Sequence, residues 1–383
     1  MKRCLLCLVL LLVGCGLLTG CNEAAGSQAV VPAEPQVLQF DELMELPEQS
    51  LFLDRAYFLP GGDYLLYGDY VMPEGRQGLL FRLAAGAELN ADSVQQLCIW
   101  PEREFFASAD CLQSYFLASP GVCVLSNQQQ HKFLLYDVAT GGTQEAALPA
   151  RLNLTAEDKA LWLADGQYLL FRLQVDAKEP QRVNTQISLY DEATNQEQAL
   201  AEFSGGLSSY LPPDEEHENW LLLTAWGDLL ELSLPSAGQP QVRQRNCPDK
   251  WPAPQPWLYY NDMQWVRQAD GDYLALQVWC EDGAYYQIVD LQGGEIGNCP
   301  FEDENGGGLL AAQGSRLYFA CGNAQPEYYG QIWAWDFSSD EREQLFGTAA
   351  DNMWDVNGGA LRPDGRELLL FSQGNLLSLP LAE

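Results

Sequence analysis

Histidine, the side chain most often used for proton transfer near neutral pH, occurs at two positions, His131 and His217. His131 follows Gln128–Gln130, where the polar run predicts the tip of a hairpin. His217 lies within Asp214–Glu218, an acidic segment expected to form a solvated loop. Neither histidine has a neighbouring Ser or Cys in a nucleophile motif, and the sequence contains no GxSxG elbow. We therefore expect both histidines to be structural, and two are too few for a His-rich metal centre.

Carboxylates are the most abundant chemically active groups. The chain has 53 Asp and Glu against 20 Lys and Arg, which gives a formal net charge of −33. This balance excludes nucleic-acid binding through a basic face, because phosphate contacts need clustered cations. Two acids could act as a pair in glycan cleavage, but the fold rather than the spacing would bring them together. The sequence therefore identifies no catalytic residue, no metal-ligand set and no cofactor.

A third group of interest is a run of large aromatic residues on a predicted loop, residues 246–261. Four prolines in this run prevent regular strand pairing, so the segment should lie on the surface. Exposed aromatic faces suit sugar rings and the side chains of protein partners. The sequence predicts a patch here that binds a protein, peptide or glycan and consists of Trp251, Trp257, Tyr259 and Tyr260.

The elements that must position these residues are short strands in a repeat of roughly 50 residues. In each repeat a short strand and a turn come first, two apolar strands follow, and a more polar strand ends the unit. The first apolar runs begin at residues 63, 121, 166, 219, 271, 315 and 365, the second at 78, 132, 186, 227, 285, 331 and 375, and the polar strands at 93, 143, 197, 240, 294 and 341. This pattern predicts an all-β fold.

The seventh unit lacks its polar strand, and the segment Gln36–Phe40 has the length and alternation to supply it. If the sheets form a ring, a strand lent by the start of the domain joins the last sheet to the first and removes an exposed edge. We therefore expect residues 36–383 to form a seven-bladed β-propeller of four-stranded antiparallel blades, closed by this N-terminal strand. Six or eight blades remain alternatives.

The N-terminus has the layout of a secretory signal. Lys2 and Arg3 precede an apolar run from Cys4 to Leu18, which ends in Leu-Thr-Gly-Cys at Cys21. This ending resembles the lipobox of bacterial lipoproteins, a resemblance that implies a cleaved signal over residues 1–20 and a lipid on Cys21. Cys15 is the second, less favoured match. Residues 21–35 then form a flexible tether, and the domain is held at a bacterial membrane outside the cytoplasm.

Two repeats carry a further resemblance. Leu361–Ser372 and, less closely, Ala164–Phe171 resemble the repeat of TolB-like propellers, which is related in form to WD-type repeats. Leu135–Gly141 resembles the quinoprotein-type repeat of the outer-membrane barrel-assembly lipoprotein, but the tryptophan pattern of that family does not recur around this chain. These resemblances imply a propeller fold, and they do not imply a function, because propellers host many.

From these features the sequence predicts a monomeric, membrane-anchored lipoprotein that acts as a non-catalytic binding or assembly scaffold, without cofactor. Its partner would be a protein, peptide or glycan, and not nucleic acid. Two alternatives remain. The first is a cell-envelope polysaccharide lyase or hydrolase that uses carboxylates in a central channel, and the second is a quinoprotein-like sensor.

Overall fold

The fold is described from a computed structural model, in which the internal contacts divide the chain into Met1–Ala33 and Glu34–Glu383. The residues described are 36–39, 51–59, 62–72, 75–84, 94–100, 112–117, 121–127, 131–164, 166–175, 183–214, 217–234, 239–245, 259–268, 271–280, 283–291, 294–298, 308–321, 331–346, 356, 358–362, 364–372 and 375–381. Within them no helix is long and apolar enough to cross a membrane. The expected signal, Cys21 and the tether lie outside these residues.

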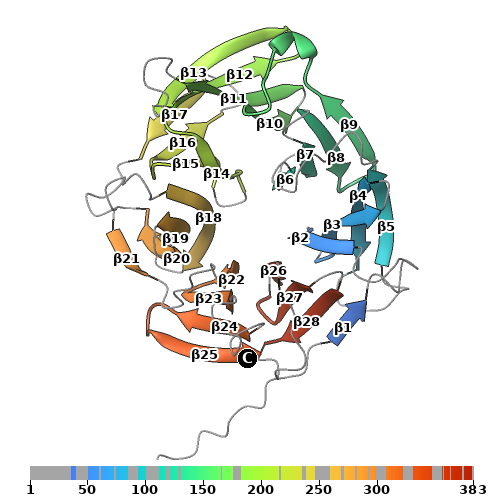
Figure 1. Ribbon diagram of the computed structural model, residues 1–383, viewed down its shortest axis with the longest axis vertical. Coiled ribbons are helices and arrows are strands. Elements are labelled where there is room, and N and C mark those ends of the chain that lie inside the picture. The colour runs from blue at the N-terminus through green and yellow to red at the C-terminus, as the bar shows by residue number, and fades with distance from the viewer. Residues whose placement is uncertain are drawn as a thin grey trace, which may run out of the picture. The chain divides into compact units, whose positions relative to one another are not determined.

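The described residues form seven antiparallel sheets of four strands, which we number I to VII in chain order (Figure 1). Sheet I consists of β2 (Leu51–Phe58), β3 (Tyr64–Met72), β4 (Gly75–Leu83) and β5 (Val94–Trp100). Sheet II consists of β6 (Leu112–Leu117), β7 (Val122–Asn127), β8 (Lys132–Asp137) and β9 (Thr143–Ala147). Sheet III consists of β10 (Lys159–Ala164), β11 (Gln167–Val175), β12 (Val183–Asp191) and β13 (Gln196–Ser204). A short 3₁₀ helix, Ala150–Leu152, connects sheets II and III.

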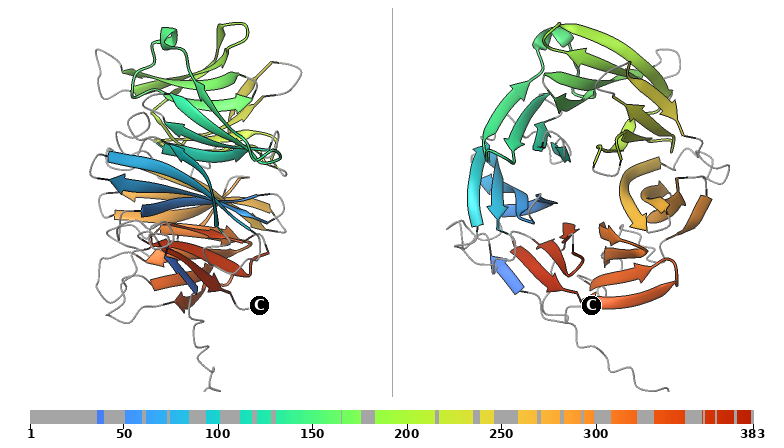
Figure 2. Two further views of the ribbon diagram at one scale, coloured as in Figure 1. Left: turned by 90° about the vertical axis from the view of Figure 1, so that its right-hand side faces the viewer. Right: turned by 180° about the vertical axis from the view of Figure 1, so that it is seen from behind.

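Sheets IV to VI repeat the same up-and-down order. Sheet IV consists of β14 (Leu207–Leu211), β15 (Trp220–Thr224), β16 (Leu229–Ser233) and β17 (Gln241–Gln244). Sheet V consists of β18 (Tyr259–Gln268), β19 (Gly271–Cys280), β20 (Gly283–Asp290) and β21 (Gly294–Asn298). Sheet VI consists of β22 (Gly308–Gln313), β23 (Arg316–Cys321), β24 (Gln331–Asp336) and β25 (Glu341–Phe346). The strands of each sheet twist relative to one another, as the edge-on view in Figure 2 shows. The predicted first, second and polar strands all coincide with strands of these sheets.

Sheet VII takes its strands from both ends of the domain. It contains β26 (Gly358–Leu361), β27 (Glu367–Ser372) and β28 (Asn375–Pro380), and its fourth strand is β1 (Gln36–Gln39). β1 pairs antiparallel with β28, with Gln36 opposite Ser378 and Gln39 opposite Asn375. The expected pairing of the segment after the tether with the final predicted strand is therefore present.

The two middle strands of a sheet are apolar because both of their faces are covered. Successive side chains of a strand point to opposite faces. In β27, Leu368 and Leu370 pack with sheet VI, whereas Leu369 and Phe371 pack with sheet I. The fourth strand is polar because it lies at a sheet edge, and β9 and β25 are mostly exposed.

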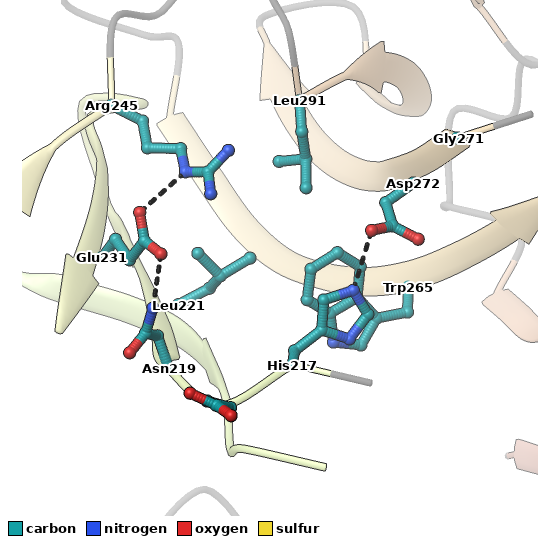
Figure 3. Close-up of a pocket in the computed structure, with 10 residues that line it drawn as sticks. His217, Asn219, Leu221, Glu231, Arg245, Trp265, Gly271, Asp272 and Leu291 are labelled. Carbon is teal, nitrogen blue, oxygen red and sulfur yellow. Dashed lines mark hydrogen bonds and ion pairs between the residues drawn. The ribbon is translucent and has the colours of Figure 1, made fainter. Parts of the chain in front are cut away.

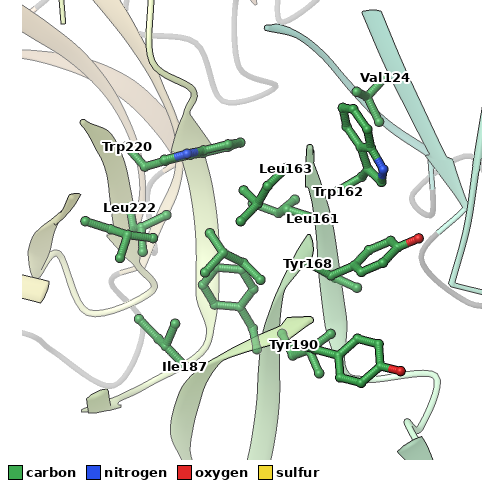
Figure 4. Packing of buried hydrophobic residues seen from close by; sticks show 14 of the residues in the cluster. Val124, Leu161, Trp162, Leu163, Tyr168, Ile187, Tyr190, Trp220 and Leu222 are labelled. Carbon is green, nitrogen blue, oxygen red and sulfur yellow. The ribbon is translucent and has the colours of Figure 1, made fainter. Parts of the chain in front are cut away.

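Six hydrophobic clusters connect consecutive sheets. They join sheets I and II, sheets II, III and IV, sheets IV and V, sheets V and VI, sheets VI and VII, and sheets VII and I. Figure 4 shows part of the cluster around sheet III, where Trp162, Tyr168 and Tyr190 lie near Leu161 and Leu163. Each sheet thus buries its faces against its neighbours, which is how a set of short sheets builds one core.

Candidate functional site

A pocket of about 420 Å³ lies between sheets IV and V (Figure 3). This volume falls within the range of small-molecule sites in proteins, roughly 300–1,000 Å³. Strands and loops of both sheets contribute to its walls, and the residues that line it are His217, Glu218, Asn219, Leu221, Glu231, Arg245, Trp265, Gly271, Asp272 and Leu291. An aromatic ring, a histidine, an arginine and three carboxylates therefore converge on one space.

His217 reaches the pocket from the turn between β14 and β15. The turn is stabilised by its own hydrogen bonds. The backbone N–H of Asp214 donates to the carbonyl of His217 (2.9 Å). The backbone N–H of His217 in turn donates to the Asp214 carboxylate (2.9 Å). These two bonds hold the backbone of His217 in place before its side chain makes any contact.

The imidazole of His217 lies between two carboxylates. Its Nδ1 is 3.1 Å from Oδ1 of Asp214, and its Nε2 is 3.0 Å from Oδ2 of Asp272 at the start of β19. The ring stacks on Trp265 of β18, with centroids 3.8 Å apart and planes 10° from parallel. A carboxylate accepts hydrogen bonds, so both contacts are bonds when the imidazole carries two protons.

The opposite wall is an ion pair. Arg245 follows β17, and its Nε donates to Oε2 of Glu231 on β16 (3.1 Å). Asn219 donates to the other oxygen of Glu231 (2.6 Å). Burial alone would raise the pKa of Glu231, but the hydrogen bonds from Arg245 and Asn219 outweigh it and leave that pKa below its usual value. Glu231 is therefore an ionised anchor for Arg245.

Arg245 presents its remaining nitrogens to the pocket. Its backbone is held by a hydrogen bond from its own N–H to the carbonyl of Leu229 (2.9 Å). In Figure 3 the two terminal nitrogens of the guanidinium point away from Glu231. A guanidinium held in this way offers a planar pair of donors that matches a carboxylate. The pocket can therefore transfer a proton at one wall and bind an anion at the other.

The sequence-predicted binding residues do not meet in this pocket. Trp251 and Trp257 lie outside the described residues. Tyr259 is the first residue of β18, where its backbone pairs with Trp279. Tyr260 is fully buried in the cluster that joins sheets IV and V. Its ring lies against Gly227, where an added Cβ would be 2.4 Å from the ring, so it packs the core and offers no exposed face.

The expectation for His217 needs correction, whereas that for His131 is confirmed. The side chain of His217 is 15 % exposed and lines a pocket, whereas the sequence predicted a solvated acidic loop. His131 lies in the turn between β7 and β8, as predicted, and it is 8 % exposed with its Nε2–H donating to the carbonyl of Thr155 (3.1 Å), which fits a structural role. The burial comes from packing between sheets and from the 150–158 connection, neither of which appears in local polarity.

The pocket residues could not be brought together from the sequence, because they are distant from one another along the chain and form no motif. His217, Arg245, Trp265 and Asp272 come from four segments and meet because sheet V packs on sheet IV. The one local signal is the spacing of Asp214 and His217, three residues apart in a predicted turn between strands, where an Asp commonly binds a backbone N–H.

Comparisons with known proteins bear on the fold. No family model matches the chain, and no curated protein matches it in sequence. Among solved structures it is similar to an oligogalacturonate lyase in complex with manganese, with 12 % identity over 92 % of this chain and 97 % of that one and a TM-score of 0.54. It is also similar to an oligogalacturonate lyase from Vibrio parahaemolyticus, with 12 % identity over 91 % and 98 % and a TM-score of 0.50.

These neighbours are β-propellers and enzymes. They correct the expectation of a non-catalytic scaffold, since the solved chains that share this fold carry out catalysis and the pocket between sheets IV and V holds groups suited to it. The likeness at 12 % identity speaks for the fold alone. The chain is therefore an all-β protein of seven antiparallel sheets whose structural neighbours have the β-propeller fold.

Proposed function

We propose that the seven sheets are the blades of one closed β-propeller, with β1 completing the last blade. Two observations support this arrangement. β1 supplies the edge strand of sheet VII, and one hydrophobic cluster joins sheet VII to sheet I. The hydroxyl of Tyr64 in sheet I also donates to Glu367 in sheet VII (3.0 Å). Deleting residues 36–39 should then expose the edge of β28 and lower the unfolding temperature, whereas an equally long deletion within the tether should not.

We also propose that Cys21 is lipidated and anchors the propeller outside the cytoplasm of a bacterium. The support is the sequence alone, in which a charged start, an apolar run and Leu18–Cys21 follow one another. Metabolic labelling with a fatty acid tests the assignment. Cys21→Ser should abolish labelling and release the protein from membranes, and Cys15→Ser is the matched control that should change neither.

For the pocket we propose a polysaccharide lyase activity on oligosaccharides that contain uronic acids. The observation that carries it is His217, bracketed by Asp214 and Asp272 and facing the guanidinium of Arg245 across the pocket. The two solved lyases of the same fold make this reaction class the natural one to test. The proposal moves the chemistry from a central channel, where the sequence suggested it, to a pocket between two blades.

Elimination needs a base for the proton on C5, the carbon beside the sugar carboxylate. Neutral His217, with Nδ1–H donating to Asp214, has its lone pair on Nε2. Asp272 is 43 % exposed, so it can turn from Nε2 toward solvent when substrate enters. The C5 proton passes to Nε2, the C4–O bond breaks, and a C4=C5 double bond forms. The protonated Nε2 then donates this proton to the leaving oxygen, which returns His217 to its neutral form, and no water is consumed.

Glu231 is not available for the two-carboxylate chemistry of hydrolysis. A glycosidase of the usual kind needs a protonated carboxylic acid and a second carboxylate that is free to react. Here both oxygens of Glu231 are bound by Asn219 and Arg245, and the lowered pKa of Glu231 keeps it ionised. The proton acceptor that we propose is instead a histidine.

The test is to incubate the purified full chain with oligogalacturonates, other uronate oligosaccharides and neutral oligosaccharides. A lyase forms a conjugated unsaturated uronate, which absorbs in the ultraviolet, together with new reducing ends. We expect both signals with uronates and neither with neutral sugars. New reducing ends without the ultraviolet signal would mean hydrolysis, and would contradict the proposal.

A further inference from the structure

The charge that develops on the sugar carboxylate during elimination needs a cationic group to stabilise it. When the C5 proton leaves, its electron pair spreads onto the carboxylate oxygens. A divalent metal ion or a fixed guanidinium can each hold those oxygens. One of the similar lyases was solved with manganese, so the first question is whether this chain can hold such an ion.

The residues around the pocket do not fit a metal ion. Manganese is best suited by carboxylate, carbonyl and water oxygens, and a protein site for it needs several such ligands gathered together. Here both nitrogens of His217 face Asp214 and Asp272, and both oxygens of Glu231 are occupied. Across the part of the chain that the structure describes, no three His, Cys, Asp or Glu gather as a ligand set.

The second histidine of the sequence cannot complete such a set at this pocket. His131 belongs to sheet II and is 8 % exposed, and its Nε2–H is bound to the carbonyl of Thr155. The pocket lies between sheets IV and V. His217 is therefore the one histidine that could offer an imidazole at the pocket.

Arg245 has the features that the metal would otherwise supply. Its Nε donates a hydrogen bond to Glu231, and this bond fixes the direction of the guanidinium. Its side chain is 36 % exposed and lines the pocket, and the terminal nitrogens point away from Glu231 (Figure 3). Two parallel N–H donors can bind both oxygens of one carboxylate, and the full positive charge faces the place where negative charge builds up.

We propose that Arg245 binds the carboxylate of the sugar ring that loses its proton, and that binding and elimination therefore need no divalent cation. This inference rests on the proposed lyase function. In it Arg245 is a catalytic residue, because it touches the atoms over which the electron pair spreads. Glu231 and Asn219 are positioning residues, because they act through the guanidinium.

The experiment uses the full chain after treatment with a chelator. We expect unchanged product formation with and without added Mn²⁺, and no Mn²⁺ binding when the metal alone is titrated in a calorimeter. Arg245→Ala should lower kcat/KM by about 10²–10³-fold, the usual loss for a group that stabilises developing charge. Arg245→Lys keeps the charge but loses the paired donors, so it should recover a small part of that loss.

Arg342→Ala is the matched control. Arg342 lies on β25 of sheet VI, its Nη2 is 3.8 Å from Oδ1 of Asp340 on an exposed surface, and it does not line the pocket. It should leave kcat/KM unchanged. Glu231→Gln should raise KM more than it lowers kcat, because Arg245 stays present but is less firmly directed. Activity that disappears with the chelator and returns with Mn²⁺ would overturn the inference.

A second readout separates this inference from the lyase proposal. Binding of a short oligogalacturonate to the chelated protein is measured by calorimetry for the wild type and for Arg245→Ala. Binding that needs Arg245 and no metal supports the inference even where no unsaturated product forms, in which case the lyase proposal alone fails. Binding that needs Mn²⁺, or that survives Arg245→Ala unchanged, refutes the inference.

Discussion

The two histidines lie in comparable places, each at a turn beside a junction between sheets, yet their surroundings differ in kind. His131 meets the backbone carbonyl of Thr155, and its Nδ1 is buried without a hydrogen-bond partner among the described residues. His217 meets two carboxylates and an indole face beside a pocket. A carbonyl and a carboxylate both accept from a ring N–H, but Asp272 is charged, 43 % exposed and lines the pocket, whereas the carbonyl of Thr155 belongs to the backbone. The contacts of a histidine therefore decide whether it can act.

In the loop near His131, polar side chains form hydrogen bonds with backbone groups. Asp158 is buried, and its carboxylate accepts hydrogen bonds from the backbone N–H groups of Thr155 (2.7 Å) and Leu173 (2.9 Å). Arg172 donates to the carbonyl of Leu152 (3.1 Å). Each polar group here satisfies the backbone of the connection between sheets II and III. None of these polar groups is among the residues that line the pocket.

The same substitution at the two positions tests this contrast most strongly. His217→Gln removes the proposed base, so formation of the unsaturated product should fall by about 10²–10⁴-fold, the range for loss of a general base. His131→Gln should keep full activity at neutral pH once the melting curve confirms that it is folded. Equal losses in both folded variants would contradict the distinction.

The second prediction separates the packing of sheets IV and V from the chemistry between them. Gly227 has φ +86°, and a Cβ there would lie 2.4 Å from the ring of Tyr260. Gly227→Ala should therefore cost about 2–4 kcal/mol in the free energy of unfolding, through backbone strain and overpacking. Gly141→Ala is the control, because φ is +69° but no atom lies within 4 Å of the added Cβ. It should cost about 1 kcal/mol in urea unfolding, from strain alone.

The third prediction concerns pH and His131. Burial lowers the pKa of His131, the carbonyl of Thr155 and the charge of Asp158 partly offset this, and Arg172 adds to the lowering. The folded protein then binds this proton less readily than the unfolded chain, whose histidine pKa is about 6.5. Stability is thus present above that pH and is lost as the pH falls through it.

The measurement is urea unfolding of the wild type and of His131→Gln from about pH 8 to about pH 5, a range that spans the histidine titration. Glutamine does not titrate, so the difference between the two proteins isolates His131 from the many carboxylates. The difference should be constant at the alkaline end and should shift against the wild type on acidification. A difference that does not change with pH would contradict the burial argument.

The smallest expected effect is that of salt on the pocket. The chain carries a formal charge of −33, so it repels an anionic oligosaccharide at a distance even though Arg245 attracts it locally. Added sodium chloride screens the long-range repulsion first. We expect kcat/KM for oligogalacturonates to rise several-fold between low and physiological ionic strength. A steep fall instead would mean that local attraction by Arg245 dominates.

The strands could be predicted from the sequence because each carries its own signal. The middle strands are continuously apolar since they are buried on both faces, as in β7, and the polar fourth strands mark the edges. The missing seventh polar strand pointed to residues 36–40, and β1 does pair with β28. The apolar and polar character of each segment was thus enough to predict which strands lie in the middle of a sheet and which lie at its edge.

The site could not be predicted because the residues that form it are far apart in the sequence and share no local motif. Asp272 is the second residue of β19 in sheet V, Arg245 follows the last strand of sheet IV, and His217 comes from an acidic turn. Acidic composition alone suggests solvation, and it was the wrong guide for His217, whose ring is covered by Trp265. Aromatic composition likewise pointed to Tyr260, which packs the core instead.

The bond from Tyr64 to Glu367 spans 303 positions of the chain, and β1 meets β28 across a similar separation. Contacts that distant form slowly, because a very long loop must close before they contribute. Sheets I to VI, whose strands are neighbours along the chain, should therefore form early, whereas sheet VII forms only when β1 and β28 have met. During that interval β28 has an open edge, and chaperones or other copies of the chain compete with β1 for it.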